Sequence, residues 1–212
     1  MIHAYDKIYL SRAQGSLATM LDFSVHDLSY SLTSFYDKFL ESSVSNMFEI
    51  GDSTTLAGRS GVELALDVIK DESKADLYRP VFNRSPEYWT GWALAYFQWW
   101  SALSFSKINS YIPISEIYGM YNPYHEMDIS QFCEKMLEIY NSRKEVTNLK
   151  FYRLKAGISQ KELAKYSNVP LRTIQQYEQR QKNINAASVE TIIKLAKVLF
   201  CSVEDLVEVS IE

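Results

Sequence analysis

The sequence contains little glycine and proline, with 7 and 5 residues respectively among 212. Both residue types interrupt helices, so their scarcity favours long, unbroken helical patterns. Apolar residues make up 47% of the chain, which is enough to form a buried core and excludes a disordered polypeptide. The composition predicts an all-α protein, and the length allows one large domain or two small ones.

Cysteine and histidine are also rare. The two cysteines, Cys133 and Cys201, lie far apart, which excludes a disulfide framework and indicates a reducing compartment. The three histidines are isolated, and "HEMD" at residues 125–128 lacks the second histidine of a zinc protease motif. No Ser/His/Asp or Cys/His arrangement is discernible. We therefore expect no metal site, no cofactor and no enzymatic activity.

Long hydrophobic runs are absent as well. The most apolar stretch, "WALAYFQWW" at residues 92–100, is far too short to span a bilayer. The first residues, "MIHAYDKIYL", lack the basic start and continuous apolar segment of a signal peptide. We expect a soluble cytoplasmic protein with no membrane partner.

Charge is distributed unevenly along the chain. Residues 1–146 hold 12 Lys and Arg against 19 Asp and Glu, whereas residues 147–212 hold 10 against 7. The polar stretch "NSRKEVTN" at residues 141–148 has no helical stripe of apolar residues. It predicts a boundary between an acidic domain, residues 1–145, and a basic domain, residues 146–212, which could face phosphate.

The first domain is predicted to be helical throughout. Ser60 with Glu63 forms a capping box, Ser85 precedes Pro86 at a helix start, and Asp128 caps a later helix. A loop is expected over residues 74–84. The apolar positions at helical spacing are Ile8, Tyr9, Ala13, Leu17, Met20 and Leu21 in a first helix, and Leu32, Phe35, Tyr36 and Leu40 in a second helix over residues 28–40.

Two stretches of this domain have both a functional and a packing interpretation. "GDSTTLAGRSG" at residues 51–61 resembles a phosphate-binding loop but lacks its Gly-Lys-Ser/Thr ending, so we favour a simple loop from Gly51 to Ser60 between two helices. One helix carries the aromatic residues Tyr88, Trp89, Trp92, Tyr96, Trp99 and Trp100. They could stack on bases or a ligand, but we favour a core role because aromatic side chains bury well.

The stretch "ISQKELAKYSNVPLRTIQQYEQRQK" at residues 158–182 contains two short helical patterns. Ser159 and Glu162 form a capping box at the start of the first pattern. Pro170 disfavours helical backbone at Val169, so the first helix must end there and a second begin. Two helices joined by a short turn are the helix-turn-helix plan.

The outer face of the second helix is unusual for an acidic protein. Arg172, Gln175, Gln176 and Gln179 recur at i, i+3, i+4 and i+7. Glutamine can bond bidentately to adenine and arginine to guanine in the major groove, so this face predicts DNA recognition. The alternative is a solvated face that happens to be rich in glutamine.

The flanking segments extend the pattern to a whole domain. "TNLKFYRLKAG" precedes it as a helix ended by Gly157, and "ASVETIIKLAKVLFCSVEDLVE" follows as two helices, the last opened by Ser202 with Asp205. Residues 147–208 resemble the five-helix domain of the Cro/phage-repressor type, the Xre family. The resemblance covers about 60 residues in order and spacing. It implies a sequence-specific DNA-binding domain.

The resemblance also implies roles for individual residues. Leu171, Arg172 and Gln176 would meet base edges, and Leu171 is a departure because a polar residue is usual there. Arg153 would form a structural ion pair with Glu178. Residues near the phosphate backbone would be Gln160, Gln175, Gln179 and Lys182. The small core would consist of Leu149, Tyr152, Ile158, Leu163, Val169, Ile174, Ile184, Ile193, Leu199 and Leu206.

Three stretches of the first domain carry a second resemblance: "YLSRAQGSLATMLDFSV", "SGVELA" and "RSPEYWTGWALAYFQWW". They are similar to a helical domain that precedes Xre-type domains in regulators and antitoxin-like proteins of Gram-positive bacteria. Together the two resemblances imply a dimeric repressor that binds an inverted-repeat operator, and an antitoxin whose residues 1–145 bind a protein toxin. The alternative is a ligand-sensing regulator whose first domain binds a small molecule or is an enzyme.

Overall fold

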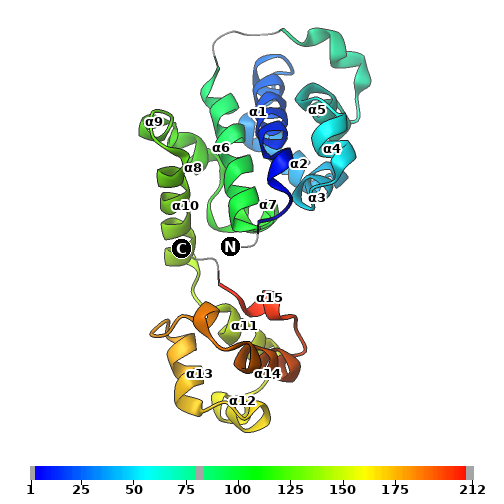
Figure 1. Ribbon diagram of the computed structural model, residues 1–212. Coiled ribbons are helices and arrows are strands. Elements are labelled where there is room, and N and C mark those ends of the chain that lie inside the picture. Colours follow the sequence, from blue (N-terminus) through cyan, green and yellow to red (C-terminus); the bar gives the residue numbers. More distant parts are fainter. Residues whose placement is uncertain (1–2, 80–83, 209–212) are drawn as a thin grey trace. The chain divides into compact units, whose positions relative to one another are not determined.

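The computed structural model describes residues 3–79 and 84–208. These residues form helices and no strands, so the all-α prediction is confirmed (Figure 1). Contacts along the chain define two compact units, which we call unit 1, up to Asn141, and unit 2, from Ser142 onward. The division lies four residues before the boundary expected from the sequence.

Unit 1 is organised around one central helix. Helix α1 packs mainly against α6 and α5 (Figure 1). The helices of the unit are η1 (Lys7–Tyr9), α1 (Leu10–His26), α2 (Leu32–Glu41), α3 (Ser43–Glu49), α4 (Ser53–Gly58), α5 (Gly61–Ile69), η2 (Glu72–Leu77), α6 (Pro86–Ser101), α7 (Phe105–Tyr111), α8 (Ile114–Gly119), α9 (Tyr121–Tyr124) and α10 (Ile129–Arg143), the last of which ends in unit 2.

The contact between α1 and α6 depends on a glycine. A Cβ atom placed on Gly91 of α6 would lie 2.6 Å from the carbonyl oxygen of Leu17 and 2.7 Å from the Cα of Ala18. Real Cβ atoms do not approach backbone so closely, so only glycine allows the two helices to meet at this point. Ala93 and Ala95 of α6 are fully buried as well, which agrees with close helix packing.

Of the six aromatic residues that the sequence marks on α6, Trp99 is core and the other five are partly buried. Trp99 is 4% exposed, and its Nε1 donates a hydrogen bond to the carbonyl oxygen of Tyr5 at 2.8 Å. Trp89 meets the rings of Tyr121 and Phe132 edge-on. Tyr88, Trp89, Trp92, Tyr96 and Trp100 are all half-buried. This arrangement supports the packing interpretation of the aromatic helix.

The predicted caps of unit 1 are confirmed. Ser60 and Glu63 form a complete capping box, Ser85 caps α6 with Pro86 in its first turn, and Asp128 accepts the N–H of Ser130 at the start of α10. These caps depend only on residues three or fewer positions apart, so local sequence is sufficient to predict them.

Several predicted boundaries in unit 1 are wrong. The first α-helix begins at Leu10, and Ile8 lies before it in η1 with 77% of its surface exposed. The second helix begins at Leu32, because Ser31 accepts the N–H of Ser34 and so caps it there. The buried face of this helix consists of Phe35, Tyr36 and Phe39, whereas the predicted Leu40 is only half-buried.

Two predicted loops contain short helices. Residues 51–61 include α4, which Asp52 caps by accepting the N–H of Thr55, so this stretch is not a simple loop. The expected loop over residues 74–84 overlaps η2, while residues 80–83 lie outside the described residues. Both errors arise because a single capping aspartate can start a helix too short to show periodicity.

Unit 2 contains the five predicted helices. Its elements are α11 (Asn148–Lys155), α12 (Gln160–Ser167), α13 (Leu171–Glu178), η3 (Ile184–Ala186), α14 (Val189–Leu199) and α15 (Val203–Leu206). The caps at Ser159 and Ser202 are complete capping boxes. The buried core consists of Leu149, Leu163, Val169, Ile174, Tyr177, Ile184, Ile192, Leu195, Ala196, Leu199 and Leu206.

Two predicted core residues of unit 2, Tyr152 and Ile158, are only partly buried against the core, and a third is wrong. Ile193 is 37% exposed, whereas its neighbour Ile192 is 7% exposed. Helix α14 buries Ile192, Leu195 and Leu199, which recur at i, i+3 and i+7. Successive residues of a helix point about 100° apart around its axis. Ile192 therefore faces the core, while the adjacent Ile193 faces the surface.

Candidate nucleic-acid interface

The turn between α12 and α13 is three residues long. Asn168 ends α12 in the left-handed conformation, with φ 53° and ψ 33°. Asparagine tolerates this conformation better than most residues, so it can replace the glycine often found there. Val169 is 4% exposed and enters the core, and Pro170 precedes α13 with an extended backbone, ψ 135°. These three residues therefore produce the sharp change of direction of a helix-turn-helix.

Helix α13, which we call the recognition helix, presents the predicted polar face. Its buried residues are Ile174, Tyr177 and Glu178. Arg172 is exposed, Gln175 and Gln176 are half-buried, and Gln179 is exposed just beyond the helix as its C-cap. Leu171 is half-buried at the first helical position and Lys182 is exposed, with its Nζ 5.6 Å from the centre of the Tyr177 ring. The structure thus groups the side chains predicted to read DNA on one helix, and their roles stay predictions.

Arg153 and Glu178 form the ion pair that the resemblance implies. Arg153 Nε lies 2.6 Å from Glu178 Oε1, and Nη2 lies 2.9 Å from Oε2, so the contact is bidentate. The two side chains are only 9% and 2% exposed. Arg153 Nη1 also donates to the carbonyl oxygen of Ile158 at 2.9 Å. The hydrogen bonds that Arg153 donates to Glu178 raise the pKa of the guanidinium, which stays charged. The pair fixes α11 to the end of the recognition helix.

Gln160 has a second structural contact. Its Nε2 donates to Glu178 Oε2 at 2.8 Å, so the start of α12 is tied to the end of the recognition helix. The predicted phosphate contact could therefore use the second N–H of Nε2 or the backbone N–H of Gln160, without breaking this bond. The sequence did not indicate the contact, because Gln160 and Glu178 are 18 residues apart.

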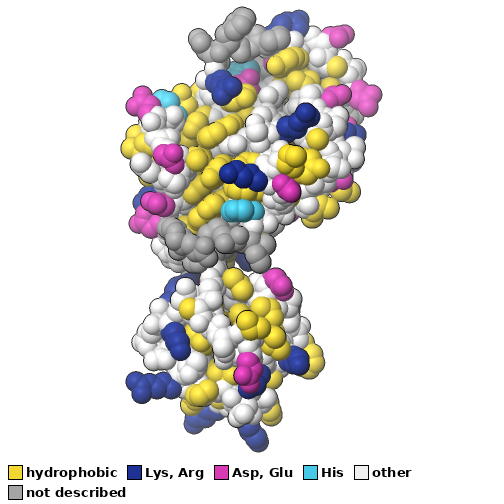
Figure 2. All heavy atoms as spheres, viewed as in Figure 1, with side chains coloured by type: hydrophobic (Ala, Val, Ile, Leu, Met, Phe, Trp, Pro, Cys, Tyr) yellow, Lys and Arg dark blue, Asp and Glu magenta, His cyan; other side chains and the backbone are white. Residues whose placement is uncertain are grey.

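Unit 2 carries a net positive charge. Residues 142–208 carry 12 Lys and Arg against 7 Asp and Glu. Figure 2 shows Lys and Arg side chains spread over this unit. Arg172, Arg180 and Lys182 are exposed on or directly after the recognition helix. A positive surface beside a helix rich in amides fits a polyanion with hydrogen-bonding groups, which is the chemistry of duplex DNA.

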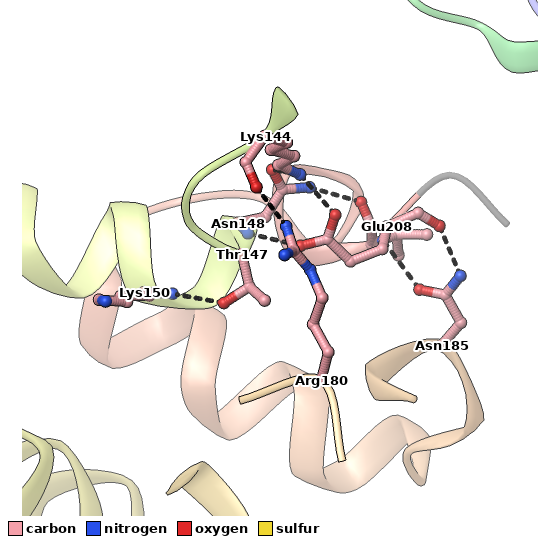
Figure 3. A network of polar contacts seen from close by, with 8 residues as sticks. Lys144, Thr147, Asn148, Lys150, Arg180, Asn185 and Glu208 are labelled. Atoms are coloured by element: carbon pink, nitrogen blue, oxygen red, sulfur yellow. Dashed lines mark hydrogen bonds and ion pairs between the residues drawn. The ribbon is translucent and has the colours of Figure 1, made fainter. Parts of the chain in front are cut away.

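Unit 2 contains a polar network that the sequence did not predict (Figure 3). Lys144 is 5% exposed although it lies in the stretch predicted to be a linker. Its Nζ is bonded to Glu208 and lies 2.8 Å from Asn148 Oδ1. Arg180 Nη2 donates to the carbonyl oxygen of Lys144 at 2.6 Å. Polar residues in connecting segments carry no periodic signal, so nothing in the sequence marked them.

Outside the recognition helix, the described residues offer little that could serve as a metal, catalytic or ligand site. Within residues 3–79 and 84–208, no three His, Cys, Asp or Glu side chains are grouped as metal ligands. Burial raises the pKa of the Cys133 thiol to about 12, which makes it unreactive. Unit 1 has an open hollow of about 690 Å³, whose lining includes Arg12, Arg59, Tyr78 and Tyr88.

None of the helices that the structure describes is both long and apolar enough to cross a membrane.

Comparison with known proteins agrees with this geometry. Residues 149–206 match a family described as helix-turn-helix, and these residues span α11 to α15. No curated protein and no solved structure is significantly similar to the chain. The match indicates a DNA-binding transcriptional regulator.

Proposed function

We propose that this DNA-binding transcriptional regulator is a repressor that recognises a specific operator through unit 2 and acts as a dimer. The observation that supports the proposal is the recognition helix, on which Arg172 and Gln176 are displayed beside a buried, bidentate Arg153–Glu178 pair. A rigid helix that carries guanidinium and amide groups can read base edges in the major groove. The protein would act in the cytoplasm, where the DNA is.

Arg172→Ala and Gln176→Ala should each weaken binding to the specific operator by about 1–3 kcal/mol, because each removes contacts to a base edge. Gln176→Ala should leave the affinity for random DNA almost unchanged, since it removes no charge. The operator can be selected from a random pool with the full chain, and affinities measured by gel shift. Normal operator binding by both variants would show that the proposed face is wrong.

The dimer proposal is supported by Phe200. This residue follows α14 with φ 52° and ψ 43°, and it is 95% exposed. The left-handed conformation disfavours a side chain with a Cβ, and full exposure of a large ring to water adds no stability. Coverage by a second copy would explain why phenylalanine occupies this position. Two copies would also double the phosphate contacts, on half-sites about 34 Å apart.

Phe200→Gly should weaken dimerisation yet raise the stability of the monomer by about 1 kcal/mol, because glycine adopts positive φ without strain. Phe200→Leu is the matched control, since it keeps both an apolar side chain and the strained backbone, and it should dimerise more strongly than the glycine variant. Light scattering of the full chain gives the oligomeric state, and urea unfolding gives the stability. A wild-type protein that stays monomeric on DNA, with a footprint over one half-site, would exclude the dimer.

Unit 1 supports a further part of the proposal, that the protein is an antitoxin. Residues 1–141, which form unit 1, hold 10 Lys and Arg against 18 Asp and Glu, which suits a basic protein partner. A toxin that acts on nucleic acid has a basic cleft for its substrate, and unit 1 would bind it without catalysis. The test is capture of the adjacent gene's product by the full chain, which should weaken as salt rises.

The second candidate function is ligand sensing. It is favoured by the open hollow of about 690 Å³ in unit 1, whose lining includes Arg12 and Arg59. Native mass spectrometry of the purified protein separates the two candidates. A small molecule retained by the full chain, together with no capture of the neighbouring product, would favour the sensor.

A further inference from the structure

Arg180 has an unfavourable backbone conformation. It lies two residues beyond the recognition helix, and its φ is 57°. Glycine is the residue that adopts this conformation without strain. The guanidinium of Arg180 donates a hydrogen bond from Nη2 to the carbonyl oxygen of Lys144 at 2.6 Å, a contact that glycine could not make. The side chain therefore provides an interaction that offsets the strained backbone.

The carbonyl group that Arg180 contacts belongs to a fixed segment. Lys144 directly follows α10, the helix that begins in unit 1 and ends at Arg143. Glu208 holds this segment at two points: it bonds the buried Nζ of Lys144, and its Oε1 accepts the N–H of Asn148 at 2.5 Å (Figure 3). A charged carboxylate with a buried ammonium and a backbone N–H is a strong anchor.

Glu208 also contacts Asn185, which lies beyond the loop that follows the recognition helix. The N–H of Glu208 donates to Asn185 Oδ1 at 2.8 Å, and Asn185 Nδ2 donates to the carbonyl oxygen of Glu208 at 2.5 Å. The segment from the loop after the recognition helix into η3, residues 179–185, is thus held at both ends, by Arg180 against Lys144 and by Asn185 against Glu208. The end of the recognition helix and the segment at residues 144–148 therefore share one network (Figure 3).

We propose that Arg180 is a positioning residue that couples the recognition helix to the segment at residues 144–148. The inference rests on the proposed DNA binding of unit 2 and adds a means of regulating it. Coupling between two sites is reciprocal. DNA bound at the recognition helix stabilises the segment, and displacement of the segment weakens DNA binding.

Three variants of the full chain separate positioning from direct DNA contact. Arg180→Gly removes the bond to Lys144 and relieves the backbone strain. Arg180→Ala removes the bond but keeps a strained residue, so any difference between the two variants reports strain alone. Lys182→Ala is the matched control, because it removes an exposed cation two residues away whose Nζ lies over Tyr177 and outside the network. The probes are a duplex selected from a random pool by the wild-type chain and a scrambled duplex of the same composition.

Arg180→Gly should bind the selected duplex about tenfold more weakly, a factor within the range typical of coupled sites, while its affinity for the scrambled duplex changes much less. Lys182→Ala should weaken binding to both duplexes by the same factor and reduce the salt slope by about one. Arg180→Gly would instead behave like Lys182→Ala if Arg180 contacts a phosphate directly, and this result would overturn the inference.

Hydrogen exchange of the full chain measures the coupling itself. The selected duplex should increase the protection of residues 142–148 in the wild type and in Lys182→Ala, but not in Arg180→Gly. Equal protection by DNA in Arg180→Gly and in the wild type would also overturn the inference. If the wild-type chain selects no sequence from the random pool, the proposed function fails. If the wild-type chain selects a sequence and the Arg180 variants bind it as tightly as the wild type, only the coupling is rejected.

Discussion

Glu178→Leu should destabilise unit 2 by about 3–5 kcal/mol, the usual effect of leaving one partner of a buried ion pair alone. Glu178 is 2% exposed and holds the Arg153 guanidinium by two hydrogen bonds. A guanidinium cannot lose its charge by releasing a proton. In the variant Arg153 would keep only the carbonyl oxygen of Ile158 as a partner, which does not neutralise it.

Arg153→Leu should be somewhat less destabilising than Glu178→Leu. The carboxylate left behind still accepts a hydrogen bond from Gln160 Nε2, and a carboxyl group can also take up a proton. The double variant Arg153→Leu/Glu178→Leu should recover most of the loss, because two apolar side chains can fill the site without a buried charge. Additive effects of the two single changes would show that the residues do not interact.

The measurement must report on unit 2 alone. The tryptophans, at positions 89, 92, 99 and 100, all lie in unit 1, so their fluorescence does not follow unfolding of unit 2. Hydrogen exchange of peptides from residues 148–206 in the full chain measures the opening of unit 2 directly. Peptides of unit 1 from the same experiment serve as the internal control and should exchange as in the wild type.

Gly91→Ala should destabilise unit 1 by about 3 kcal/mol, the upper part of the range for overpacked contacts. The new methyl group would meet the backbone of α1 at 2.6–2.8 Å, and backbone cannot rotate away as a side chain can. Helices α1 and α6 would have to separate along a contact that organises the unit. Larger residues at position 91 should prevent unit 1 from folding.

Gly15→Ala is the matched control for this change. Gly15 lies in the interior of α1, and a Cβ there would have no neighbour within 4 Å. The substitution should therefore stabilise unit 1 by roughly 0.5–1 kcal/mol, because alanine favours the helix over glycine. Urea unfolding followed by tryptophan fluorescence measures both variants. A Gly91→Ala protein as stable as the wild type would mean that the two helices do not approach as closely as described.

Local signals in the sequence were sufficient for the helix-turn-helix itself. Ser159 and Glu162 start α12, Pro170 ends the turn, and apolar residues at helical spacing define the buried faces. Each signal depends on residues only a few positions apart, so it can be recognised in the sequence without knowledge of the rest of the fold. The charge difference between the two parts of the chain is also a property of the sequence alone. The Arg153–Glu178 pair, in contrast, could be expected only from the family resemblance.

Tertiary packing alone decided the remaining features. Only the packed helix showed that Ile192 rather than Ile193 is core, because the two differ by one step around α14. Lys144 belongs to unit 2 through partners 36 and 64 residues away, Arg180 and Glu208. Gln160 is tied to Glu178 across 18 residues. Such contacts form only when distant segments are brought together, and an isolated polar residue in a connecting segment has no periodicity that would predict its partner.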